Sequence, residues 1–221
     1  MIDAVVKVGG SLGRGECLRE VCACLTEAGR RHRLLVVPGG GAAADVVREQ
    51  DARFGLRPAT AHWMAVLAMD QYGLLLADLM PGAETVRTLD RARTRLAEEG
   101  GVVVLLPSEP LRRADALPYS WSVTSDAIAA WVTQAADGRL LVLLKDHHGM
   151  ARLTPAAASG TPRLVDVSEV VASGSVDGHL ARLFSEAAFD LWMIDGEHPQ
   201  RLARLLDAGS TEGVKLVRQA P

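Results

Sequence analysis

Short apolar runs that alternate with helical segments constrain the fold of this chain more than any other feature. The runs are rich in aliphatic and β-branched residues, as is typical of buried strands, and they cover residues 3–8, 34–37, 84–88, 102–106, 139–144, 191–194 and 214–217. Segments with apolar residues at helical spacing lie between them, and we expect helices over residues 16–28, 41–50, 60–80, 90–99, 124–136, 177–187 and 199–207. This alternation favours an α/β fold with a largely parallel sheet that helices cover on both faces.

Three details of this assignment depend on single residues. Thr60 is the expected N-cap of the longest helix, because its hydroxyl can accept a hydrogen bond from the first turn. Gly73 is a candidate break inside the same helix. Pro110 and Pro118 predict a loop between the fourth strand and the helix that follows it.

Length and composition indicate one ordered globular domain. Hydrophobic residues make up 48% of the 221 residues and charged residues 23%, which is ordinary for a folded protein and argues against disorder. Residues 151–176 are rich in Ala, Ser, Gly and Pro, and we expect them to be irregular with one short helix over 168–172. The sequence shows neither an internal repeat nor a linker, so we expect a single domain over residues 1–221.

Charge and hydropathy exclude several classes of partner. The net charge of −3 provides no electrostatic basis for binding nucleic acid or an anionic membrane surface. No apolar run approaches the roughly 18–20 residues of a membrane span, and Met1 leads directly into a strand, so we expect a cytoplasmic protein. Cys17, Cys22 and Cys24 fit neither a disulfide framework nor a zinc site, and we interpret them as buried reduced thiols.

The sequence Val-Val-Lys-Val-Gly-Gly-Ser at residues 5–11 predicts a phosphate site. Glycines at the end of a strand let the backbone turn sharply and present amide groups to an anion, and Gly9 and Gly10 stand at that point. A lysine within a strand is costly unless its ammonium emerges onto an opposite charge. We therefore expect Lys7 to reach the carboxyl end of its strand.

Lysine is rare in this chain, which makes each lysine informative. Only three of the 24 basic residues are lysines, namely Lys7, Lys145 and Lys215. A lysine that persists among arginines suggests a need for a compact point charge, as beside a phosphoryl group. Chance survival is the alternative for any one of them, and it suits Lys215 near the C-terminus best.

Four polar or glycine-rich clusters lie where the sequence predicts a strand end or a helix start. They are Lys7 to Ser11, Gly39-Gly40-Gly41, Thr124-Ser125-Asp126 and Lys145-Asp146. Ligands of open α/β sheets bind at the carboxyl ends of the strands, so these clusters are candidates for one site. The triple glycine is either an anion cradle at a helix start or a flexible tight turn.

Asp126 also has two interpretations. It complements the helix dipole from the first turn of a helix that Thr124 caps, or it holds the two lysine ammonium groups in place for phosphoryl transfer. Neither G-x-x-x-x-G-K-[ST] nor a helix-opening G-x-G-x-x-G occurs in the sequence, which disfavours P-loop enzymes and dinucleotide-dependent dehydrogenases.

In this order, the four clusters resemble the motifs of the amino acid kinase superfamily, and the resemblance covers nearly the whole chain. It implies a three-layer α/β/α sandwich around an open, mainly parallel sheet of about eight strands, and the use of ATP with Mg²⁺. It further implies catalytic roles for Lys7, Asp126 and Lys145. The residues that it places at the nucleotide are Gly9, Gly10, Ser11, Gly40, Gly41, Asp146, Gly149 and Met150, and no residue is expected to bind a metal directly.

Secondary motifs resemble those of the branch of this superfamily that acts in methanofuran-type cofactor biosynthesis. These motifs are His-Trp-Met at 62–64, Ala-Met-Asp-Gln at 68–71, Pro-Tyr-Ser-Trp at 118–121 and Asp-Gly-Glu-His-Pro at 195–199. The implied acceptor is (aminomethyl)furanmethyl phosphate, which becomes a diphosphate. The candidate acceptor-binding residues are Arg14, Gly39, His62 and Trp121, whose ring suits an aromatic acceptor.

The chain departs from the superfamily in two places. Relatives often have Asp-Gly where His148-Gly149 stands in this chain. Many relatives carry a second lysine on a late helix, and the corresponding stretch at 177–182 has none. Either Lys145 or Arg182 supplies that charge, or the activity is altered. We therefore keep three hypotheses: a kinase with a small-molecule phosphate (or carboxylate) acceptor, a nucleotide- or oxyanion-binding or storage protein of the same fold, and another kinase of the superfamily that acts on uridylate or isopentenyl phosphate. We also expect a homo-oligomer.

Overall fold

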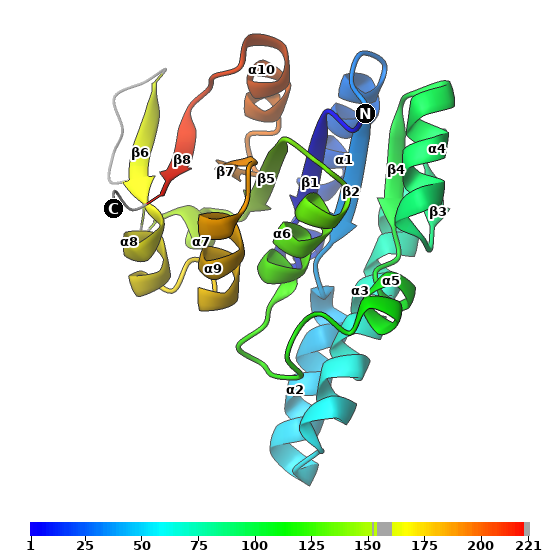
Figure 1. The fold of residues 1–221 in the computed structure, drawn as a ribbon, viewed down its shortest axis with the longest axis vertical. Helices are drawn as coiled ribbons and strands as arrows, with labels where there is room; N and C mark the ends of the chain where they lie inside the picture. Colours follow the sequence, from blue (N-terminus) through cyan, green and yellow to red (C-terminus); the bar gives the residue numbers. More distant parts are fainter. Residues whose placement is uncertain (152, 154–160, 219–221) are drawn as a thin grey trace.

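The computed structural model describes residues 1–151, 153 and 161–218. Its centre is one eight-stranded sheet, shown in Figure 1. The strands are β1 (Ala4–Val8), β2 (Leu34–Pro38), β3 (Glu84–Val86), β4 (Val102–Leu105), β5 (Leu140–Lys145), β6 (Pro162–Asp166), β7 (Asp190–Asp195) and β8 (Gly213–Val217). Their order across the sheet is β3-β4-β2-β1-β5-β7-β8-β6, and every pairing is parallel except the antiparallel pairing of β7 with β8. The expected mainly parallel eight-stranded sheet is confirmed.

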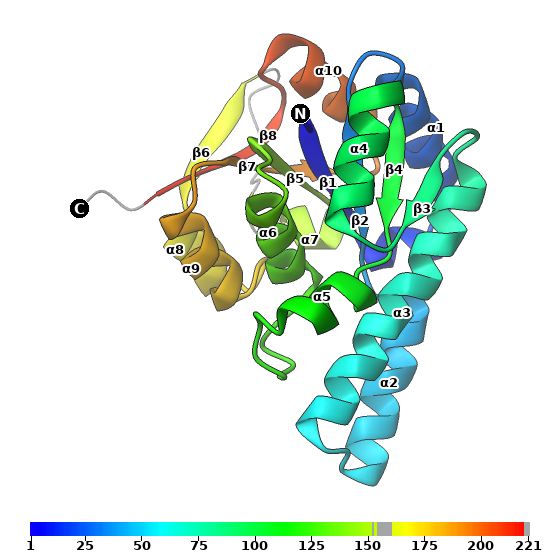
Figure 2. The same cartoon turned by 45° about the vertical axis from the view of Figure 1, so that its right-hand side comes forward.

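At least one helix lies between each pair of consecutive strands. The α-helices are α1 (Leu18–Gly29), α2 (Gly41–Phe54), α3 (Pro58–Leu79), α4 (Leu89–Glu99), α5 (Ser108–Ala114), α6 (Ser125–Ala135), α7 (His147–Ala151), α8 (Val167–Ala172), α9 (Gly178–Glu186) and α10 (Gln200–Ala208), and a 3₁₀-helix, η1, covers Gly10–Arg14. Figure 2 shows α2 and α3 side by side, extending beyond the sheet.

The sheet separates two apolar cores, as expected for a three-layer sandwich. One core joins the sheet to α4, α6, α8 and α9, and the other joins it to α1 and α10. Alternate residues of β1 enter opposite cores, because successive side chains of a strand point to opposite faces: Val5 lies in the first core and Val6 in the second. Helix α3 contributes to both, through Val66 to the first and Leu76 to the second.

Two expectations for the longest helix are wrong. Helix α3 begins after Arg57, with Pro58 in its first turn, so Thr60 is not the N-cap. The helix also continues through Gly73 without a break. A Cβ at Gly73 would lie 2.8 Å from Cδ2 of Leu106, so this glycine permits close packing against the end of β4 instead of ending the helix.

The expected loops are more ordered than the sequence suggested. Pro110 lies inside the short helix α5, because proline is tolerated in the first turn of a helix. The expected helix over 168–172 is present as α8, but β6 precedes it within the stretch predicted to be irregular. Part of that stretch, residues 152 and 154–160, lies outside the described residues.

The long apolar helix α3 is only partly buried, because Leu67, Leu74 and Leu75 are exposed. Among the helices of the described residues, none is long and apolar enough to cross a membrane. Cys22 is buried and Cys17 and Cys24 are half-buried, and all three are free thiols. Of the three thiols that we expected to be buried, only Cys22 is fully buried.

Candidate active site

Lys7 and Lys145 meet because of strand alternation and register. In β1, Lys7 shares the face of Val5, and in β5, Lys145 shares the face of Leu143. The two strands are neighbours, with Lys7 opposite Leu143, so Lys145 lies two residues further along the same face. Both ammonium groups therefore emerge at the carboxyl edge of the sheet, on the side that α6 covers.

Asp126 lies between the two ammonium groups. Its Oδ1 lies 2.9 Å from Nζ of Lys7, and its Oδ2 forms an ion pair with Nζ of Lys145. Lys145 also donates to the carbonyl of Ser175 at 2.9 Å. The hydroxyl of Thr124 accepts from the amide of Asp126 at 3.2 Å, so the helix is capped as expected while the Asp126 side chain remains free for the lysines.

Burial makes this charge cluster electrostatically strong. Lys7 is 5% exposed and Asp126 is 4% exposed. Burial would raise the pKa of Asp126, but the ammonium groups of Lys145 and Lys7 together lower it to about 2. Burial lowers the pKa of Lys7, and the opposite charge of Asp126 counteracts that effect. The carboxylate therefore stays ionised at any physiological pH and holds both lysines.

The depressed pKa of Asp126 predicts a specific loss of stability in acid. Its pKa is about 2 in the folded chain against an ordinary value of 3.8, so its contribution is present above pH 3.8 and lost as the pH falls towards 2. We expect this contribution to the free energy of unfolding to be on the order of 2 kcal/mol. Urea unfolding between pH 5 and 2 measures it: Asp126→Asn should show a shallower pH dependence than the unmodified chain, and equal slopes would contradict the assignment.

The two glycine loops pack against each other at the same edge. A Cβ at Gly10 would lie 2.3 Å from the amide nitrogen of Gly41, and a Cβ at Gly39 would lie 2.5 Å from that of Gly10. Gly41 also has a φ of +58°, which favours glycine. The triple glycine is therefore a tightly packed turn that opens α2.

The amides of these loops have different roles. The amide of Gly9 donates to the carbonyl of Leu144 at 3.0 Å, and that of Gly39 donates to the carbonyl of Val8 at 2.9 Å. Both donors extend the sheet ladder, so the amides of Gly9 and Gly39 are already paired within the chain. The candidate anion cradle is reduced to the backbone at Gly10, Gly40 and Gly41.

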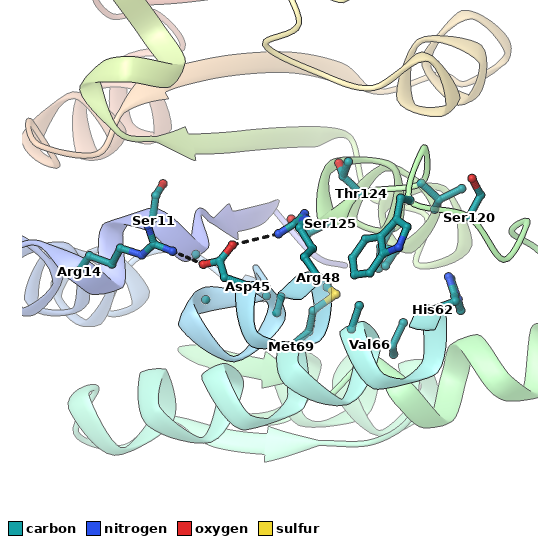
Figure 3. A pocket seen from close by; sticks show the side chains of 18 residues that line it. Ser11, Arg14, Asp45, Arg48, His62, Val66, Met69, Ser120, Thr124 and Ser125 are labelled. Carbon is teal, nitrogen blue, oxygen red and sulfur yellow. Dashed lines mark hydrogen bonds and ion pairs between the residues drawn. The ribbon is translucent and has the colours of Figure 1, made fainter. Parts of the chain in front are cut away.

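A cavity of about 290 Å³ opens beside this cradle. Figure 3 shows Ser11 and Arg14 at one end of it and His62 and Ser120 at the other. The lining residues come from the two glycine loops, α2, α3 and the start of α6, and they are Gly10, Ser11, Arg14, Gly40, Gly41, Ala44, Asp45, Arg48, His62, Ala65, Val66, Met69, Ser120, Trp121, Val123, Thr124, Ser125 and Ile128. Three of the four expected acceptor residues, Arg14, His62 and Trp121, thus line one cavity, and Gly39 does not line it.

One face of α2 supplies charged groups that the sequence analysis missed. Asp45 forms ion pairs with Arg14 and, at 3.1 Å, with Nη1 of Arg48 (Figure 3). The guanidinium of Arg48 lies 5.0 Å from the centre of the Trp121 ring, and the indole of Trp121 donates to Asp51 at 2.6 Å. The spacing of 45, 48 and 51 places these side chains on one helix face. Charged residues at this spacing after a glycine turn are the sequence signal that could have revealed them.

His62 lies in an aromatic cluster at the far end of the cavity. Its ring centroid lies 5.3 Å from that of Trp63 and 5.0 Å from that of Tyr119. Burial lowers the pKa of His62, and the more distant Asp115 partly opposes this. His62 is therefore a neutral hydrogen-bonding group, not a cation, at neutral pH.

Three of the residues expected at the nucleotide, Asp146, Gly149 and Met150, lie just after β5 and in α7. Oδ1 of Asp146 accepts from the amide of Gly149 at 2.8 Å. Burial would raise the pKa of Asp146, but this amide and the hydroxyl of Ser11 lower it. Asp146 therefore links α7 to the first glycine loop. Met150 differs from the others because its side chain is buried in the core between the sheet and α6.

The structure distinguishes between Lys145 and Arg182, the two residues that could supply the charge of the missing late lysine. Arg182 is exposed on α9, whereas Lys145 touches Asp126 at the centre of the site. This placement favours Lys145 as the second cation.

Comparison with known proteins agrees with this architecture. The sequence pattern of the amino acid kinase family matches residues 4–179. The chain belongs to the amino acid kinase family. This membership makes it a phosphotransferase of the kinase type, as the motif order predicted.

The relatives are distant in sequence, but each aligns with nearly the full length of this chain. A "[5-(aminomethyl)furan-3-yl]methyl phosphate kinase" of Methanocaldococcus jannaschii is 24% identical over 217 residues, which are 96% of this chain and 97% of that protein. Uridylate kinase of Archaeoglobus fulgidus has a TM-score of 0.72 at 17% identity and covers 98% of this chain and 100% of its own. Isopentenyl phosphate kinase of T. acidophilum has a TM-score of 0.61 at 16% identity and covers 97% and 100%. Both structures share the fold of this kinase.

The arrangement fits a magnesium ion held by phosphates better than one held by a protein cage. Within the described residues, no group of three or more histidine, cysteine or acidic side chains could hold a metal. Both oxygens of Asp126 already face ammonium groups. Mg²⁺ in kinases is commonly bound by substrate phosphates with few protein ligands, and this site is compatible with that mode.

Proposed function

We propose that this kinase transfers the γ-phosphoryl group of ATP, supplied with Mg²⁺, to a phosphate oxygen of a small phosphomonoester. The observation that supports this most is the convergence of Lys7 and Lys145 on Asp126, beside a glycine cradle and a cavity. Phosphoryl transfer depends mainly on positioning and on neutralising charge, and these are the functions that such a cluster can provide.

The proposed transfer is direct, without a covalent enzyme intermediate. An acceptor oxygen bonds to the γ-phosphorus as the bond from that phosphorus to the β,γ-bridging oxygen breaks, and ADP leaves with the electron pair. Lys7 and Lys145 neutralise negative charge on the moving group, and Asp126 keeps the two ammonium groups oriented. The backbone at Gly10, Gly40 and Gly41 receives phosphoryl oxygens.

The cavity chemistry supports an acceptor with a phosphate and a flat ring. Arg14 and Arg48 each use part of a five-donor guanidinium on Asp45, so donors remain for an acceptor phosphate. The ring of Trp121 offers a face for stacking, and neutral His62 offers a hydrogen bond. The name of the Methanocaldococcus relative indicates a furan phosphomonoester, and (aminomethyl)furanmethyl phosphate is our proposed acceptor.

An acceptor screen tests this proposal. The purified kinase is incubated with ATP, Mg²⁺ and each of (aminomethyl)furanmethyl phosphate, UMP and isopentenyl phosphate, and ADP release is measured with and without acceptor. We expect release that depends on the furan phosphate. Release with UMP or isopentenyl phosphate alone would indicate another kinase of the family, and nucleotide binding without acceptor-dependent release would indicate a binding protein.

Substitution of Arg48 tests its part in acceptor binding. Arg48→Met should raise KM for the acceptor by about 10-fold or more, because a charge-assisted contact contributes about 1.5–3 kcal/mol, and should leave KM for ATP unchanged. Arg53→Met is the matched control, since Arg53 lies on the same helix but stacks on Phe54 outside the cavity lining. An unchanged acceptor KM in Arg48→Met would remove Arg48 from the acceptor site.

Homo-oligomer formation, a single domain over residues 1–221 and a cytoplasmic location stay predictions.

A further inference from the structure

The carboxylate of Asp177 joins the starts of two helices. Its Oδ1 accepts from the amide of Leu180 at 2.9 Å and so caps α9. Its Oδ2 accepts from the amide and the hydroxyl of Thr124, at 3.2 and 2.5 Å, and from the amide of Ala127 at 3.3 Å. One side chain thereby receives four hydrogen bonds, three of them from the N-terminal turn of α6.

This bridge acts on the turn that carries Asp126. A helix start presents unpaired amide donors and a partial positive charge, and a carboxylate satisfies both. Asp126 lies between the two bridged residues, Thr124 and Ala127, and its side chain holds Lys7 and Lys145. The position of the first turn of α6 therefore determines where the two ammonium groups are held.

The chain just before Asp177 contacts the second lysine. The carbonyl of Ser175 accepts from Nζ of Lys145 at 2.9 Å. The amide of Ser175 is itself fixed by the hydroxyl of Ser173 at 3.3 Å. Residues 175–177 thus touch Lys145 through their first member and α6 through their last. Neither Ser175 nor Asp177 lines the cavity beside the glycine cradle.

We propose that Asp177 is a positioning residue for phosphoryl transfer, which sets the first turn of α6, and with it the Lys7–Asp126–Lys145 cluster, relative to the glycine cradle. This role rests on the proposed function of the site. Asp177 does not touch the transferred group in this scheme and acts through Thr124, Ala127 and Asp126. Its loss should lower kcat and leave acceptor binding in the cavity nearly unchanged.

Comparison of two capping residues, Asp177 and Asp166, distinguishes a positioning role from helix capping alone. Asp166 caps α8 in the same way, with Oδ1 accepting from the amide and the hydroxyl of Ser168 at 2.8 and 2.5 Å. Asp166→Ala and Asp177→Ala should both lower the melting temperature. Only Asp177→Ala should lower kcat, by about 10²-fold, as expected when catalytic groups shift by about 1 Å. Asp177→Asn should recover part of kcat, because its amide oxygen can still accept from Thr124.

A spectroscopic measurement keeps this inference independent of turnover. The chain has only three lysines, so lysine labelled with ¹³C at the ε carbon gives three assignable NMR signals at one fixed pH. Asp177→Ala should move the signals of Lys7 and Lys145, Asp177→Asn should move them less, and Asp166→Ala should move neither. The signal of Lys215 on β8 serves as the internal reference.

The outcomes are distinguishable. If the chain turns over no acceptor but Asp177→Ala still displaces the Lys7 and Lys145 signals, the proposed function is refuted, whereas the structural part of the inference, that Asp177 positions the two lysines, is retained. Unchanged signals, or equal losses of kcat in Asp177→Ala and Asp166→Ala, would overturn the positioning role and leave Asp177 as a helix cap.

Discussion

Substitution of Lys7 by methionine should lower kcat by about 10³-fold while the chain still unfolds cooperatively. Removal of one preorganised charge from a site where negative charge develops costs about 10²–10³-fold in rate, and Lys7 is buried at the carboxyl edge of the central strand β1. Folding should persist because Asp126 keeps Lys145 as a partner. Acceptor-dependent ADP release measures the rate, and thermal unfolding followed by circular dichroism measures the fold.

Two further lysine variants make this result specific. Lys7→Arg retains the charge but replaces a compact ammonium with a larger planar group, and it should remain severely impaired because the space around Lys7 is closed. Lys215→Met is the matched control, since Lys215 lies on β8 and pairs with Asp190 at 3.2 Å at the surface. A Lys7→Met enzyme with near-normal kcat would refute the central role of this residue, and so would a Lys215→Met enzyme equally impaired.

Substitution of Asp126 by alanine should cost both activity and stability. It leaves two ammonium groups close together without a carboxylate between them, and loss of one partner of a buried ion pair typically costs about 3–5 kcal/mol. The pKa of Lys7, already lowered by burial, should fall further. A larger share of Lys7 is then neutral at a given pH, and kcat should fall by about 10²-fold or more.

The pH dependence of kcat and a control substitution on α4 show why Asp126→Ala loses activity. A lysine with a lowered pKa regains its charge as the pH falls, so the residual kcat of Asp126→Ala should increase from pH 8 to pH 6 relative to the unmodified enzyme. Asp90→Ala is the matched control, because Asp90 occupies the first turn of α4 behind the capping residue Thr88 but is exposed. If both variants behave alike, Asp126 serves only the helix dipole.

Much of the catalytic edge was accessible from the sequence because strand alternation is a strict rule. Lys7 lies one residue before the end of β1 and Lys145 is the last residue of β5. In a parallel sheet the carboxyl ends of neighbouring strands meet at one edge. The motif order then indicated Asp126 as their common partner. The interactions that hold this partner were less visible, because Asp177 is 51 residues away from Asp126 and only the folded chain brings the starts of α6 and α9 together.

The misassigned elements have a common physical origin. Strand β6 has the mixed sequence Pro-Arg-Leu-Val-Asp, in which only Val165 is fully buried, so it lacks the apolar run that revealed the inner strands. Its register comes from pairing with β8 at the sheet edge. Gly73 resembled a helix break, but its conformation is imposed by packing against Leu106. In both cases tertiary contacts overrode local propensity.

Because α3 is uninterrupted, side chains that line the cavity and side chains that support the glycine loops lie along one continuous helix. Its first half presents His62, Val66 and Met69 to the cavity that we propose for the acceptor. Further along, Tyr72 packs against the glycine loops, with its hydroxyl donating to the carbonyl of Gly9 at 3.3 Å. Substitutions in the first half can therefore reshape the space for a new acceptor while the phosphate cradle keeps its geometry. A scaffold of this kind allows related kinases to diverge in what they phosphorylate without rebuilding how they do it.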